Sequence, residues 1–187
     1  MIKLDSKTTA LVLIDLQKGI LGYPLAPLTS AQLLSGGIAL AEQFRAAGSP
    51  VVLVNVAWAA DGSDVLHAPV DQPSHPPGGF PEGFADLGDG LAKPGDILIT
   101  KRQWGAFYGT ELDLQLRRRG VKTIVLGGVA TNFGVESTAR QAWEYGYEVV
   151  IAEEATTSLA TELHNVSIKN ILPLISRIAA SGAITLG

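Results

Sequence analysis

Residues 127–142 of the chain, GGVATNFGVESTARQA, carry the signal that decides the fold. The apolar run at 123–126 leads into this stretch, and after it Val135, Ala139 and Ala142 recur at the spacing of a helix face. Small residues fill the turn between the two patterns. The stretch therefore predicts a buried strand, a tight turn and a helix.

The turn has two interpretations. The first turn of a helix presents unpaired backbone N–H groups at the positive end of the helix dipole, which suits a carboxylate, a phosphate or a developing oxyanion. Alternatively, this is ordinary chemistry of a strand-to-helix turn, in which Thr131 or Asn132 serves as the N-cap. The turn alone does not separate them.

Composition places broad limits on function. At 187 residues, with 47% hydrophobic and 17% charged residues, we expect a single globular domain over residues 1–187. The net charge of −4 gives no indication of nucleic-acid or membrane binding, and we expect a cytoplasmic protein. The absence of cysteine excludes disulfides, cysteine-ligated zinc and thiolate catalysis.

Apolar strand patterns alternate with helical patterns, which predicts an α/β fold with a mostly parallel sheet. Residues 58–95 interrupt the alternation with six prolines and several glycines, and they are interpreted as a lid or an interface segment. The phenylalanines Phe80 and Phe84 suggest that this segment packs against another part of the chain. The predicted strands are 9–14, 51–56, 96–100, 123–126, 147–152 and 184–186, and the predicted helices are 31–47, 110–116, the one ending near 146, and 161–178.

Three chemical features follow directly on apolar strands. Asp15 follows the first strand, Lys101 follows the third, and the 129–134 turn follows the fourth. The carboxyl ends of parallel strands share one edge of a sheet, so we expect all three to meet there. A carboxylate with an ammonium partner is a general acid or base with a tuned pKa. Whether Asp15 is protonated or ionised is left open by the sequence.

Other polar and aromatic residues give weaker signals. The three histidines, His67, His75 and His164, form no metal-binding spacing, so no metal ion and no cofactor is expected, and His164 is interpreted as a surface or capping residue. Trp104 and Phe107 follow Lys101 closely and either line a pocket or belong to the core.

Three separated motifs resemble the isochorismatase-like hydrolase superfamily. They are residues 14–17 (IDLQ), residues 100–110 with TK and AFYGT, and residues 128–139 (GVATNFGVESTA). The resemblance runs nearly end to end and is closest to small bacterial members that carry glycine in place of the catalytic cysteine. It implies a Rossmann-like three-layer α/β/α fold, a six-stranded sheet in the order 3-2-1-4-5-6, a small-molecule substrate and a homo-oligomer.

The resemblance also implies a site. The Asp–Lys–Cys triad of the cysteine hydrolases corresponds to Asp15, Lys101 and Gly134, so the nucleophile is missing. The family's non-proline cis peptide would join Val129 and Ala130. The residues expected around the substrate are Gln17, Trp104, Phe107, Val129, Ala130, Thr131, Asn132 and Phe133, with Trp104 and Phe107 included because they follow Lys101 closely.

Three functional hypotheses remain open at this point. The leading one is a cofactor-free hydrolase of a small anionic or carbonyl-bearing metabolite, with Asp15 as acid or base and Lys101 as its electrostatic partner. The second is a catalytically silent binding or assembly protein that retains the hydrolase fold. The third has the Thr131 hydroxyl in the role of the missing thiol, which requires a well-placed base.

Overall fold

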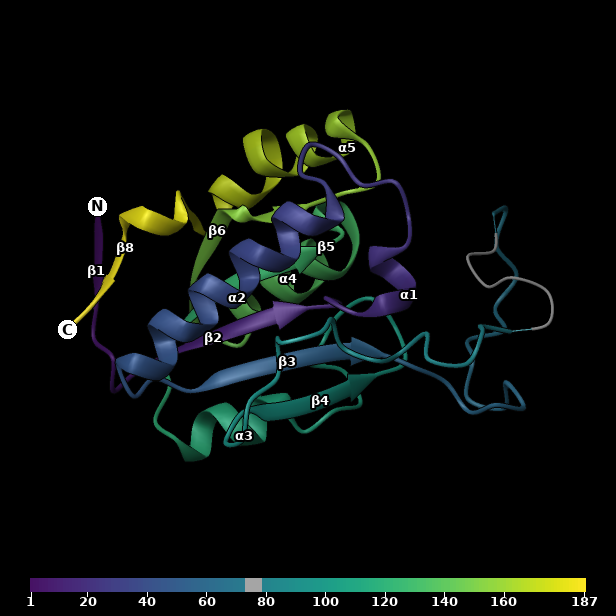
Figure 1. The fold of residues 1–187 in the computed structure, drawn as a ribbon, viewed down its shortest axis with the longest axis horizontal. Coiled ribbons are helices and arrows are strands. Elements are labelled where there is room, and N and C mark those ends of the chain that lie inside the picture. The colour runs from purple at the N-terminus through teal and green to yellow at the C-terminus, as the bar shows by residue number, and fades with distance from the viewer. Residues whose placement is uncertain (73–78) are drawn as a thin grey trace.

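The structure is a computed structural model that describes residues 1–72 and 79–187. Within them, one sheet has six strands, all parallel, in the order β4-β3-β2-β5-β6-β7 (Figure 1). This order confirms the predicted 3-2-1-4-5-6 topology and the α/β class. The strands are β2 (Thr9–Ile14), β3 (Val51–Val56), β4 (Ile97–Lys101), β5 (Thr123–Val129), β6 (Glu148–Thr157) and β7 (Arg177–Ala179).

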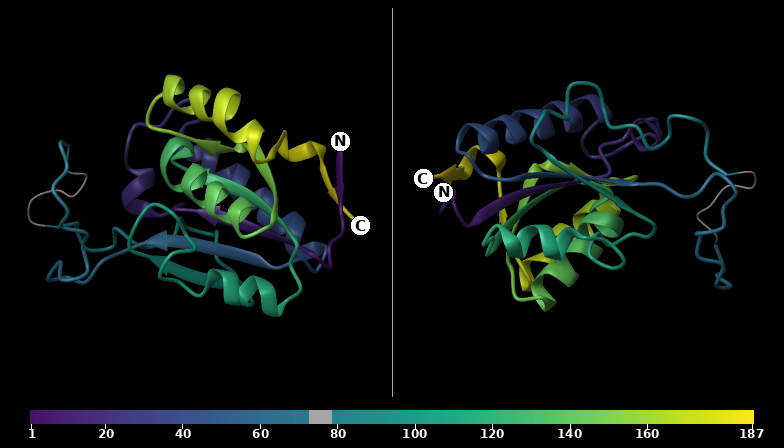
Figure 2. Two further views of the ribbon diagram at one scale, coloured as in Figure 1. Left: turned by 180° about the vertical axis from the view of Figure 1, so that it is seen from behind. Right: turned by 90° about the horizontal axis from the view of Figure 1, so that it is seen from below.

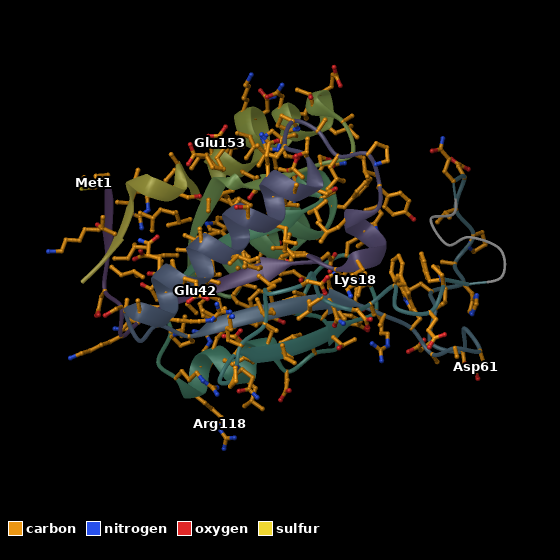
Figure 3. All side chains as sticks on the ribbon, in the orientation of Figure 1. Met1, Lys18, Glu42, Asp61, Arg118 and Glu153 are labelled. Carbon is orange, nitrogen blue, oxygen red and sulfur yellow. The ribbon has the colours of Figure 1, made fainter. Side chains whose placement is uncertain are left out.

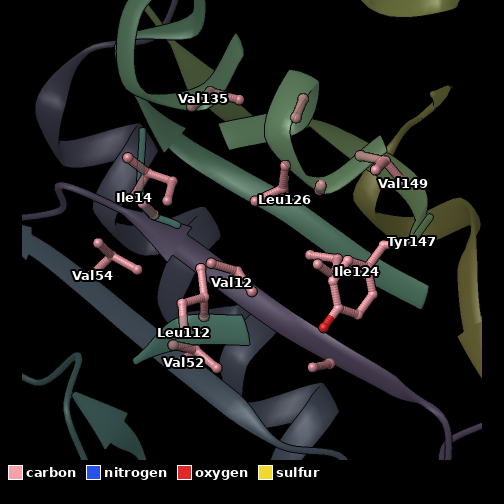
Figure 4. Close-up of a cluster of buried hydrophobic side chains, with 14 of the residues drawn as sticks. Val12, Ile14, Val52, Val54, Leu112, Ile124, Leu126, Val135, Tyr147 and Val149 are labelled. Carbon is pink, nitrogen blue, oxygen red and sulfur yellow. The ribbon is translucent and has the colours of Figure 1, made fainter. Parts of the chain in front are cut away.

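Helices cover both faces of this sheet (Figure 2). Long apolar strands buried on both sides are typical of parallel sheets, and every residue of β2 and β5 is buried. Alternate residues of β2 point to opposite layers: Leu11 and Leu13 pack with the helix α2 (Ser30–Ala46), whereas Val12 and Ile14 pack with α3 (Leu112–Arg118) and α4 (Glu136–Glu144). Figure 4 shows the cluster of buried side chains that contains Val12 and Ile14.

The C-terminal part of the chain differs from the prediction. The sixth strand of the main sheet is β7, whereas the predicted strand at 184–186 is β8 (Ile184–Leu186), which pairs with β1 (Ile2–Leu4) in a separate two-stranded sheet. The predicted helix 161–178 is also broken. Pro173 cannot donate a helical hydrogen bond, and the chain runs through α5 (Thr161–Val166), the π-helix η2 (Ser167–Ile171) and the 3₁₀ turn η3 (Leu172–Leu174).

The first part of the interrupted segment, residues 58–72, lies beyond the carboxyl ends of the strands (Figure 1), whereas its last residues run back along α2, where the Leu91 carbonyl accepts a hydrogen bond from Arg45. Its described residues, 58–72 and 79–95, contain no helix or strand, and His75 lies outside the described residues. Phe80 and Phe84 pack as expected, with ring centroids 4.1 Å apart and Trp58 stacked on Phe80 at 4.8 Å. Figure 3 places Asp61 at this end of the molecule and Arg118 at another.

Candidate active site

Asp15 and Lys101 form a buried ion pair at the carboxyl ends of β2 and β4. The Lys101 ammonium Nζ lies 2.8 Å from Asp15 Oδ2, and the side chains are only 2% and 7% exposed. Parallel pairing through β3 brings the two strand ends to one edge, which is the convergence that the sequence indicates. The other carboxylate oxygen, Oδ1, is buried and has no hydrogen-bond partner among the described residues.

The surroundings of Asp15 make its carboxyl harder to ionise than that of an exposed aspartate. Burial raises the pKa of the Asp15 carboxyl to about 6, against the opposing pull of the Lys101 charge. The backbone of Asp15 has a φ of 55°, a left-handed conformation that Asp tolerates better than most residues. Such conformations cost of order 1–3 kcal/mol and cluster at functional sites.

Gly134 lies directly against this pair. A Cβ built on Gly134 would come 3.2 Å from Asp15 Oδ2 and 2.9 Å from Cγ2 of Ile14. The second distance is too short for an ordinary contact, so the packing of Ile14 leaves no room for a side chain here. Glycine is therefore the residue that allows the turn to approach Ile14 and the Asp15 carboxyl this closely.

The turn that holds Gly134 is not capped as predicted. Residues Thr131–Val135 form the π-helical turn η1, its N-cap is Ala130, and no side chain caps it. The peptide bond between Val129 and Ala130 is cis. Neither Thr131 nor Asn132 is an N-cap, so the ordinary capping interpretation of this turn is wrong.

Thr131 and Asn132 instead connect the turn by side-chain hydrogen bonds to His164 and Ser158, which lie later in the chain. The Thr131 hydroxyl lies 2.8 Å from His164 Nδ1, and Ser158 donates a hydrogen bond to Asn132 Oδ1. His164 is 4% exposed, so its interpretation as a surface residue is wrong; burial lowers its pKa and favours the neutral ring. Neither the fully buried Thr131 nor Asn132 lines the cleft described below, so the Thr131–His164 and Ser158–Asn132 pairs hold the turn in place.

A cleft of about 1530 Å³ opens over the ion pair. Trp104 is 54% exposed in it and packs on Phe133 with ring centroids 4.7 Å apart. The predicted residues that line the cleft are Asp15, Lys101, Trp104, Val129, Ala130, Phe133 and Gly134.

Two further predicted residues do not line it. Gln17 is fully buried; its amide donates to the carbonyls of Val56 and Phe84 and accepts from the Val56 N–H. Through these hydrogen bonds Gln17 links the 58–95 segment, at Phe84, to the end of β3, at Val56. Phe107 is 4% exposed and packs with Tyr145 and Tyr147, which supports its alternative assignment to the core.

The cleft also contains residues that sequence reasoning missed. The aromatic rings of the 58–95 segment form one wall, and Arg102, Ser137 and Gln141 contribute polar groups. Ser137 and Gln141 follow Gly134 by three and seven residues, so helical spacing from the turn was the signal that could have identified them.

Residues 1–72 and 79–187 contain no group of three or more His, Cys, Asp or Glu side chains placed to hold a metal ion. No helix in the same ranges is long and apolar enough to cross a lipid bilayer.

Comparison with known proteins agrees with this fold. The isochorismatase domain model matches residues 9–181. The chain is 53% identical to the isochorismatase family protein YecD of Escherichia coli O157:H7 over 182 residues, 95% of each chain. It is 43% identical over 180 residues to the family protein YwoC of Bacillus subtilis, covering 94% of this chain and 92% of that protein.

Among solved structures, an isochorismatase family protein from Burkholderia thailandensis superimposes with a TM-score of 0.92 at 38% identity. The match covers 97% of this chain and 95% of the other. The family model spans most of the sequence, and both sequence relatives cover nearly its whole length. This chain therefore belongs to the isochorismatase family, within the isochorismatase-like hydrolase superfamily.

Proposed function

We propose that this protein hydrolyses a small anionic or carbonyl-bearing metabolite without a covalent enzyme intermediate. The observation that carries the proposal is the buried Asp15–Lys101 pair, 2.8 Å apart, at the floor of a cleft beside Gly134. No cysteine is present in the chain to form a thioester. Acid catalysis with water as the nucleophile is the chemistry that these residues support.

Asp15 is the proton donor in this scheme. A carboxyl with a pKa of about 6 retains a useful protonated fraction near neutral pH, where a general acid works best when its pKa is close to the ambient pH. Oδ2 accepts the hydrogen bond from Lys101, so the proton resides on Oδ1, which has no hydrogen-bond partner in residues 1–72 and 79–187. The Lys101 charge then stabilises the carboxylate that remains after proton transfer.

The reaction balances without a cofactor. Asp15 transfers its proton either to the terminal carbon of an enol ether or to a carbonyl oxygen. In both cases the carbon next to the protonated atom becomes electrophilic. Water adds to the activated carbon, and the ionised Asp15 takes up the proton that the water loses, which restores the protonated carboxyl. The adduct then collapses: Asp15 protonates the leaving oxygen or nitrogen and takes the proton of the adduct's hydroxyl, so the products are a carbonyl compound and an alcohol or amine, and Asp15 is again protonated.

The test is a panel of vinyl ethers, amides and esters assayed with the parent and with Asp15→Asn. We expect turnover of at least one member by the parent and a loss of at least a hundredfold in the variant, the lower range for general acid–base catalysis. The matched control Asp89→Asn removes an exposed carboxylate outside the cleft, paired with Lys18, and it should retain activity. Equal rates with and without the Asp15 carboxyl would refute the proposal.

The alternative function is a catalytically silent binding or assembly protein. It predicts ligand-induced rises in melting temperature across the panel and no product from any member. We also propose a homo-oligomer, because several large apolar side chains are more than half exposed, among them Leu98, Tyr108 and Trp143. Light scattering on the purified protein should give a mass at least twice 19.6 kDa, and a monomer would refute this part.

A further inference from the structure

A polar stripe runs from the reacting end of the cleft along α4. Gly134, Ser137 and Gln141 are spaced by three and seven residues, and all three line the cleft. Residues at this spacing share one face of a helix, and two helical turns rise by roughly 10 Å. Gln141 therefore lies two helical turns along α4 from the end of the cleft that holds Asp15.

The side-chain amide of Gln141 is held in a defined orientation. Its Oε1 accepts a hydrogen bond from the Phe107 N–H at 3.3 Å. The amide lies against Gly105, where a Cβ would overlap it, so the glycine makes the approach possible. Because Oε1 is fixed by the backbone, Nε2 is the end of the amide that can donate to a ligand, and it makes no hydrogen bond to the described residues.

The charges in the cleft indicate which acceptor Nε2 would meet. Lys101 is already in contact with Asp15, and Arg102 is paired with Asp64. Three further carboxylates line the cleft, and they disfavour a second anion away from the ion pair. These are Asp61, Glu82 and Asp86.

We propose that Gln141 is a specificity residue, whose Nε2 donates a hydrogen bond to a neutral carbonyl oxygen of the substrate while the reacting carbon lies beside Asp15 and Gly134. The placement of the reacting carbon rests on the function proposed above. The recognition of a neutral acceptor by Gln141 is independent of that function. If it holds, the substrate class narrows to uncharged carbonyl compounds. The aromatic wall formed by Trp104 and Phe133 suits a flat group between the two ends.

The test uses binding and requires no turnover. Acetophenone supplies a flat ring with one neutral carbonyl, and benzoate supplies the same ring with a charged acceptor. Dissociation constants for both are measured by NMR titration on the parent and on Gln141→Glu. That variant keeps the oxygen that accepts from Phe107 and replaces the donor with a second acceptor.

Gln115→Glu is the matched control, since it adds the same charge to the exposed face of α3, outside the cleft. We expect the parent to bind acetophenone more tightly than benzoate. Gln141→Glu should weaken acetophenone binding by about three- to tenfold, the range for one neutral hydrogen bond, and Gln115→Glu should leave it unchanged. Gly105→Ala, which displaces the amide without changing its chemistry, should also weaken acetophenone binding.

Three results would overturn the assignment: no saturable binding of acetophenone to the parent, benzoate bound as tightly as acetophenone, or an unchanged constant in both Gln141→Glu and Gly105→Ala. Urea midpoints of the variants establish that they are folded. A substrate panel without turnover would defeat the proposed hydrolysis but leave these binding constants standing, so the two failures are distinguishable.

Discussion

Replacing Asp15 by asparagine should remove the part of the pH dependence of the unfolding free energy that comes from the Asp15 carboxyl. The folded-state pKa of Asp15 is about 6, raised from 3.8, because burial outweighs the attraction of Lys101. Below pH 3.8 the carboxyl is protonated in both folded and unfolded chains. Between 3.8 and 6 the folded chain binds more protons, so its free energy of unfolding falls as the pH rises.

The size of the effect follows from the shift. A difference of about two pKa units corresponds to about 3 kcal/mol, of which about 2 kcal/mol develops between pH 4 and pH 7. Asparagine mimics the neutral carboxyl and tolerates the left-handed backbone at this position. The unfolding free energy of Asp15→Asn, relative to the parent, should therefore rise by about 2 kcal/mol over this range.

Urea unfolding, followed by tryptophan fluorescence at several pH values, measures this difference directly. Any constant cost of the substitution, such as a weaker contact with Lys101, cancels in the pH dependence. If the difference in unfolding free energy between variant and parent does not change with pH, the effects of burial and of the Lys101 charge on the pKa of Asp15 cancel. A difference that falls with pH would show that Lys101 dominates and depresses the pKa of Asp15, which would refute the reasoning behind the acid role.

Other perturbations test neighbouring parts of the site. Lys101→Met removes the charge that opposes burial, so the pKa of Asp15 should rise and the pH–rate profile should move to higher pH; an unmoved profile would contradict the coupling. Gly134→Ala forces its Cβ against Ile14 and should cost about 1–3 kcal/mol in urea unfolding, whereas a neutral result would show that the turn yields easily. Thr131→Val leaves His164 Nδ1 without its partner and should cost about 1–3 kcal/mol, and an unchanged urea midpoint would exclude a positioning role.

The main sheet and the meeting of Asp15 with Lys101 could be predicted because both depend on strong local patterns. Long apolar strands determine a parallel sheet, and a residue just after such a strand must lie at its carboxyl edge. The pairing of β1 with β8 could not be predicted, since each is only three residues long and their contact joins the two ends of the chain.

The assignment of individual side chains to the cleft was less successful. Gln17 and Phe107 lie close in sequence to site residues, but sequence proximity does not determine which way a side chain points. The Gln17 side chain instead hydrogen-bonds the backbone at the end of β3, and the Phe107 ring packs in the hydrophobic core. His164 contacts Thr131 across 33 residues, and nothing in the pattern of a short helix reveals such a partner.

The pH dependence of kcat/KM, measured on a panel member that the parent turns over, tests the central claim most directly. If Asp15 acts as the general acid, kcat/KM should be constant at low pH and fall tenfold per pH unit above about 6. A rate that rises through pH 6, or that ignores this range, would contradict the account, because the reaction would then require the ionised carboxylate or would not use Asp15.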